Sequence, residues 1–154
     1  MVGNLMSYSP YFLNAQAKGS VKGVASNFTN ASGSSMVKGT PAAINTNSQL
    51  VTVDVSNEAN VLAFVGLTNV IIPASATGGV QDTGRLEDVT FPSFNLGDPL
   101  WIGKDGNLTN AKPEIGVGGF VDGDFVVFVG VFVRNEFTST LRDIKLAIEL
   151  VGRL

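Results

Sequence analysis

The sequence predicts an all-β fold, a small antiparallel β-sandwich or barrel, on three observations. The 154 residues include 18 glycines and 10 phenylalanines, and only 15% of the chain is charged. This composition favours tight turns and pleated strands over long helices. Short apolar runs recur at intervals near the ~8 to 12 residues expected in a sandwich or barrel. Clusters of Gly, Asp, Asn and Pro separate these runs, and a chain of this length is expected to form one hydrophobic core.

The first 35 residues differ in composition from the rest and are predicted to form an extended N-terminal arm. The segment is rich in Asn, Ser, Gly and Ala and has few large apolar side chains. The exception is a small cluster, Tyr8, Tyr11, Phe12 and Leu13, which we predict to be the anchor that binds the arm to a partner. The docking surface is either the core of the same chain or a neighbouring subunit. The predicted organisation is therefore an arm, 1–35, followed by a β domain, 36–154.

The β domain begins with strands of two kinds. The stretch "QLVTVDV", residues 49–55, alternates polar and apolar positions, and this predicts a half-buried strand. The stretch "NVLAFVGLTNVIIP", residues 60–73, is apolar on both faces and predicts an interior strand. Further short runs follow at 85–94 and 97–103.

A hairpin is predicted in "GDPLWIGKDGNLT", residues 97–109. Pro99 begins a strand at a position where its missing N–H is harmless, and "LWI" forms the strand. The segment "GKDGN" is a tight turn in which Gly106 supplies the positive φ, and "LT" is the return strand.

Two apolar stretches end the chain. "FVVFVGVFV", residues 125–133, is apolar on both faces, so one face is expected to need another subunit of a homo-oligomer. "DIKLAIELVGRL", residues 143–154, alternates and predicts a strand, although helical spacing also collects several of its apolar residues. The residues predicted to be largely buried are Val51, Val53, Phe64, Val65, Ile71, Phe94, Trp101, Ile102, Val127, Val129, Val131, Ile144, Leu146 and Ile148.

The sequence also contains a weak internal repeat. "KGTPAAI" at 38–44 precedes "NVLAFVGLT" at 60–68, and "LGDPLWI" at 96–102 precedes "DFVVFVGVF" at 124–132. Each half thus offers Gly-x-Pro before one strand and Phe-Val-Gly within a later one. A Gly inside a strand marks a bulge, a bend or a close approach of backbone. The alternative is chance, because both patterns are common in β proteins rich in turns.

Several classes of chemistry are disfavoured by composition. The chain has no His and no Cys, which removes imidazole bases, Ser-His and Cys-His pairs and metal sites built on nitrogen or sulfur ligands. We expect no enzyme activity, no catalytic residues, no cofactor and no metal. Asp122 and Asp124, with Asp105 or Glu114, could supply oxygen ligands to Ca²⁺, but a polar turn with solvated carboxylates is the favoured interpretation.

Charge and hydropathy disfavour two classes of partner. The net charge is −3 and the ten basic residues are spread singly, whereas a nucleic-acid binder concentrates positive charge. No apolar run approaches the ~18 residues needed to span a bilayer. We therefore expect neither a nucleic-acid nor a membrane partner.

The order of motifs resembles the small β domains of tailed-bacteriophage virions. The residues that carry the resemblance are "GDPLWI", then "DGNLTNAKP", a Phe-Val-Gly-Val strand and a final alternating strand, with a similar pattern upstream from "MVKGTP". It covers roughly residues 36–154 and is strongest to capsid decoration, or cement, proteins and to head- and tail-fibre domains. The resemblance implies a non-enzymatic virion protein, assembled in the host cytoplasm, that binds and stabilises a capsid. It further implies a homotrimer whose partner is the major capsid protein or another virion protein.

A second function fits the same family, a fibre, tail or baseplate domain that binds a host-surface carbohydrate or receptor. Such a site presents an exposed aromatic ring beside carboxylates and amides. Trp101 with Asp98, Asp105 and Asn107 is the candidate grouping. A Trp at the centre of an apolar "LWI" run is more often a core or subunit-interface residue, which favours the structural function.

Overall fold

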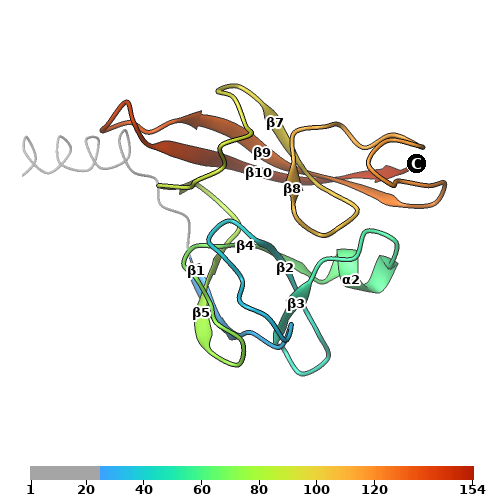
Figure 1. Ribbon diagram of the computed structural model, residues 1–154. Helices are drawn as coiled ribbons and strands as arrows, with labels where there is room; N and C mark the ends of the chain where they lie inside the picture. Colours follow the sequence, from blue (N-terminus) through green and yellow to red (C-terminus); the bar gives the residue numbers. More distant parts are fainter. Residues whose placement is uncertain (1–24) are drawn as a thin grey trace, which may run out of the picture.

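The computed structural model, shown in Figure 1, describes residues 25–154 and confirms the all-β prediction. Two five-stranded antiparallel sheets lie one above the other in Figure 1, in a sandwich-like arrangement. The first sheet has the order β1-β5-β4-β2-β3 and the second the order β6-β10-β9-β7-β8. The first contains β1 (Ala25–Thr29), β2 (Pro41–Ile44), β3 (Leu50–Thr52), β4 (Phe64–Thr68) and β5 (Thr77–Gln81). The second contains β6 (Arg85–Leu86), β7 (Pro99–Ile102), β8 (Leu108–Thr109), β9 (Phe125–Arg134) and β10 (Arg142–Arg153).

The two sheets are structural repeats of one another. Adding five to each strand number of the first order gives the second order. The registers agree as well, since Ala42 lies opposite Gly66 in the first sheet and Leu100 lies opposite Gly130 in the second. A bulge follows at the same point in both pairs of strands. The internal repeat predicted from the Gly-x-Pro and Phe-Val-Gly motifs is therefore confirmed. Gly66 approaches the carbonyl of Gln81, and Gly130 approaches that of Lys145. Because Ala25 pairs with Gln81 and Arg85 with Lys145, residue 25 is equivalent to residue 85.

One hydrophobic core joins the two sheets, and a smaller one serves the first sheet alone. The main core combines residues of the first half, such as Val55 and Leu67, with residues of the second, such as Leu100 and Phe132. The smaller core contains Met36, Ala42, Leu50, Ile72 and Val80. Because the main core draws on both sheets, we treat residues 25–154 as one cooperative unit.

Burial agrees with most of the predicted core and corrects it at one position. Val53, Ile102, Val127, Val129, Ile144 and Leu146 are buried, and seven others are half-buried: Val51, Phe64, Val65, Phe94, Trp101, Val131 and Ile148. Ile71 was predicted to be buried, which is wrong, because its side chain is 64% exposed. Ile72 pairs with Met36 and occupies the core, so the adjacent Ile71 points the other way.

The strand prediction for the C-terminal segment is confirmed by β10, and the hairpin at 97–109 by β7 and β8. Gly106 has φ +80°, as the predicted turn requires. Register shifts between Leu146 and Glu149, and between Leu150 and Gly152, interrupt the alternation expected along β10. As a result, Leu150, which the alternation places with the core residues, is 44% exposed.

A short helix replaces part of the strand predicted at 60–73. Helix α2 spans Glu58–Leu62, and the side chain of Asn57 caps it by accepting a hydrogen bond from the backbone N–H of Asn60. The apolar run that suggested a strand therefore begins in a helix and becomes β4 only at Phe64. Within residues 25–154 no helix is long and apolar enough to cross a bilayer.

The boundary predicted for the arm does not follow the sheet. Residues 25–35 were assigned to the arm, yet they contain β1, which pairs with β5 from Ala25 opposite Gln81 to Thr29 opposite Thr77. Asn30 is 1% exposed, and its side-chain amide donates to the carbonyls of Ser34 and Ile72. The short polar side chain of Asn30 thus forms hydrogen bonds with backbone carbonyl groups. The polar composition of residues 25–35 therefore did not mean that the segment is outside the sheet.

Candidate interaction surfaces

The predicted anchor lies outside the described residues. Tyr8, Tyr11, Phe12 and Leu13 all precede Ala25, where the described chain begins. Their role as a partner-binding anchor stays a prediction.

Of the candidate carbohydrate site, Trp101 with Asp98, Asp105 and Asn107, only Asp105 and Asn107 are hydrogen-bonded to each other. Trp101 is half-buried and packs edge to face on Phe128, with ring centroids 5.1 Å apart. Its Nε1 atom is buried and donates to no acceptor among residues 25–154. Asp98 accepts from the Asn95 backbone in its own turn and from the Asn110 side chain, which follows β8, so its carboxylate is engaged within the chain.

The other two members of that grouping bond to each other. The carboxylate of Asp105 accepts from the backbone N–H and the side-chain amide of Asn107, at 3.0 and 3.1 Å. These are contacts of a tight turn. The packed indole and the internally bonded carboxylates do not form the open aromatic platform that a sugar ring stacks on.

The carboxylates considered for Ca²⁺ include one that is bound by a lysine. Asp124 is 1% exposed, and both of its oxygens accept from Lys104 Nζ, at 2.6 and 2.7 Å. The backbone N–H of Val121 donates to the same carboxylate. Across the described chain no group of three acidic side chains lies close enough to hold a metal ion. The described geometry thus supports an ion pair at Asp124.

Local hydrogen bonds lower the pKa of three carboxyl groups. Burial raises the pKa of Asp124, but the Lys104 ammonium and the Val121 N–H lower it further than burial raises it, so the net shift is downward. The Ser56 hydroxyl and N–H lower the pKa of Asp54, and the Asn95 N–H lowers that of Asp98.

These shifts predict how stability depends on pH. A carboxyl group whose pKa is lower in the folded state stabilises the fold above its ordinary pKa of 3.8, and this contribution is lost as the pH falls through the folded value. No histidine is present to titrate near neutrality. We expect the free energy of unfolding to vary little from about pH 8 to about pH 5 and to decrease below about pH 4. Urea unfolding at a series of pH values measures this, and a marked loss of stability between pH 5 and 8 would contradict it.

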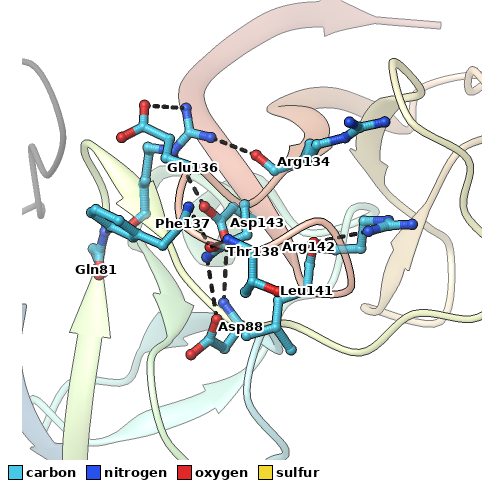
Figure 2. A network of polar contacts seen from close by, with 11 residues as sticks. Gln81, Asp88, Arg134, Glu136, Phe137, Thr138, Leu141, Arg142 and Asp143 are labelled. Carbon is cyan, nitrogen blue, oxygen red and sulfur yellow. Dashed lines mark hydrogen bonds and ion pairs between the residues drawn. The ribbon is translucent and has the colours of Figure 1, made fainter.

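A polar network that sequence reasoning missed joins the β9–β10 hairpin to the rest of the fold (Figure 2). Its centre is Asp143, which is 1% exposed and accepts from Asn135 Nδ2 at 2.9 Å, from Arg85 Nε at 3.3 Å and from the backbone N–H of Asp88 at 3.2 Å. Arg85 also contacts Glu136, at 3.3 Å. The alternation predicted for 143–154 sets Asp143 on the face opposite to Ile144 and Leu146, so it gave no signal of the network.

Two large aliphatic side chains form an exposed surface beside the smaller core. The pairing of Met36 with Ile72 is antiparallel, so Val37 and Ile71 lie opposite each other on the outward side. They are 58% and 64% exposed. We call these two residues the aliphatic surface. Val70 is 47% exposed but lies beside Gly78 with Ile72, so its side chain is on the other side. The sequence signal for Ile71 was the run "NVIIP", in which three apolar neighbours cannot all face the core.

The backbone beneath the aliphatic surface is held by hydrogen bonds. The carbonyl of Val37 accepts from Thr68 Oγ1 at 2.6 Å, and Met36 and Ile72 exchange two backbone hydrogen bonds. The backbone that carries the exposed side chains is therefore ordered before any partner binds.

Comparison with models of known protein families finds no match, and a comparison with curated proteins finds no relative.

Proposed function

We propose that the protein is a non-enzymatic structural component of a tailed-bacteriophage virion that binds and stabilises the capsid. The observation that carries this proposal is the aliphatic surface, Val37 and Ile71, presented on backbone that is already ordered. Clustered exposed aliphatic side chains of this kind favour contact with another protein surface. The sandwich-like fold and the motif resemblance of residues 36–154 support the same function. In this proposal the protein is a homotrimer in the virion, and its partner is the major capsid protein.

The proposal predicts that a charge on the aliphatic surface abolishes particle binding. Ile71→Asp places a carboxylate in the interface, and burying it unpaired should weaken binding to capsids by at least about tenfold. Because Ile71 is 64% exposed, the fold itself should be retained. Cosedimentation of the purified protein with capsids of its virus, prepared without it, measures the effect.

Ile115→Asp is the matched control, since Ile115 is 61% exposed on a different loop. It should bind capsids as the wild type does. Absence of the wild-type protein from purified virions would overturn the proposal, and equal binding of the two variants would remove the aliphatic surface from it. Light scattering tests the trimer independently.

Binding of a host-surface carbohydrate is the alternative function. The packing of Trp101 on Phe128 and the internal hydrogen bonds of Asp98 and Asp105 favour it less. A glycan array separates the two, because a capsid-binding protein should give no defined hit.

A further inference from the structure

Strand β10 has one edge that is only partly covered. On one side β10 pairs with β9 along its length, from Arg142 to Arg153. On the other side its partner β6 covers only Ile144 and Lys145. Among the described residues no strand pairs with that edge beyond Leu146. Unpaired strand edges of this kind are sites at which another strand adds.

A groove lies beside this edge. It has a volume of about 670 Å³ and runs between Phe64 and Val65 of the first sheet and residues 146–149 of β10. Asp82 and Thr83, in the connection between the two sheets, line it as well. The groove therefore has a mixed lining, in which Phe64 and Val65 are apolar and Asp82 and Glu149 supply carboxylates.

We propose that residues 14–24 of the same chain add as a strand to the free edge of β10 and occupy this groove. The described chain begins at the groove, because Ala25 pairs with Gln81, the residue before Asp82. Continuing this antiparallel register by one residue sets residue 24 opposite Asp82.

The internal repeat supports the same path. Ala25 is equivalent to Arg85, so residue 24 is equivalent to Gly84. In the second half the Gly84 carbonyl accepts from the backbone N–H of Leu146, the first residue beyond the β6 pairing. In the proposed docking, the equivalent bond would join the carbonyl of residue 24 to the N–H of Asp82 and would direct the preceding residues along the groove.

The sequence of residues 14–24 has the alternating pattern expected of a strand at this edge. In "NAQAKGSVK", residues 14–22, every even position is polar, and the odd positions are Ala15, Ala17, Gly19 and Val21. This is the period-2 pattern of a strand with one small apolar face, which could pack on Phe64 and Val65 of the groove.

The charges and the length also fit. Residues 1–24 contain Lys18 and Lys22 but no acidic residue, whereas Asp82 and Glu149 lie at the groove. Eleven extended residues reach roughly 36 Å, which exceeds the roughly 17 Å spanned by five residues of β10. Tyr8, Tyr11, Phe12 and Leu13 then lie beyond the groove, so this inference is independent of the capsid proposal and is tested without capsids.

Engineered cysteines test the proposal directly, because the natural chain has none. Ala147→Cys places a thiol in the groove and is combined in turn with a second cysteine at residues 17, 18, 19, 20 and 21. Disulfide formation under a mild oxidant is followed by non-reducing electrophoresis and peptide mass mapping. Docking as a strand predicts fast crosslinking within one chain from the odd positions and slow crosslinking from the even ones.

Ser7→Cys with Ala147→Cys is the control, since position 7 lies outside the proposed strand and should crosslink slowly. A tether that does not dock would give a smooth decline from position 21 to position 17, because loop closure depends only weakly on length. That result, or crosslinks formed between chains instead of within one, would overturn the proposal.

Hydrogen exchange tests the docking on the wild-type chain, without engineered cysteines. In the wild-type chain, the β10 amides beyond Leu146 that face this edge should exchange more slowly than in a Val21→Asp variant, by a factor of roughly ten or more. Equal exchange rates would count against docking.

Discussion

Replacing Gly130 by alanine is expected to cost about 3 kcal/mol or more of unfolding free energy. Gly130 lies in β9 with φ +157°, and a Cβ there would overlap the backbone carbonyl of Lys145 on β10. The obstacle is main chain of the paired strand, which cannot move without breaking the ladder. A loss of this size lowers the melting temperature by roughly 6 to 12 °C in a chain of this length. Thermal unfolding followed by circular dichroism measures it.

The internal repeat supplies a second test of the same mechanism. Gly66 is the equivalent residue in β4, with φ +129°, and a Cβ there would overlap the backbone carbonyl of Gln81. Gly66→Ala should therefore be destabilising to a similar degree. Gly152→Ala is the matched control, since Gly152 has φ +152° but nothing within 4 Å of the added Cβ. A loss in the control equal to that of Gly130→Ala would assign the effect to backbone conformation and not to the close approach.

The sequence predicted the fold where local periodicity and packing agree. The apolar run at 125–133 corresponds to β9, and the strand predicted at 49–55 is present over Leu50–Thr52 as β3, because burial of one or both faces decides the pattern of a strand. The two Phe-Val-Gly motifs marked the equivalent bulges, because only glycine fits where two strand backbones come this close.

The sequence did not predict features that depend on distant partners. Ile71 is exposed because its neighbour Ile72 pairs with Met36, thirty-six positions earlier, and no local pattern states which of two adjacent isoleucines enters the core. The Asp143 network draws its members from three separate segments. Residues 25–35 were assigned to the arm because the sequence does not show that β5 pairs with them.

Removal of the Asp143 carboxylate is expected to cost about 3 kcal/mol, the second large effect. The side chain is 1% exposed and accepts three hydrogen bonds, from Arg85, Asn135 and the Asp88 backbone. Asp143→Ala leaves the buried Asn135 amide and the partly buried Arg85 guanidinium without this acceptor. The Arg85 guanidinium is held on the other side by the Arg134 carbonyl, at 2.8 Å, so it cannot simply turn toward solvent. Urea unfolding at neutral pH gives the free energy.

A double-mutant cycle separates the network from the loss of packing. If Asp143 acts through Arg85, the double variant Asp143→Ala with Arg85→Ala should cost less than the sum of the two single changes, by about 1 kcal/mol or more. Asp105→Ala serves as the control, since Asp105 is exposed and bonds only within its own turn. It should change stability by about 0.5 kcal/mol or less. Additive effects at Asp143 and Arg85 would show that the two side chains stabilise the hairpin separately, because a shared network requires that removing one partner lowers the cost of removing the other.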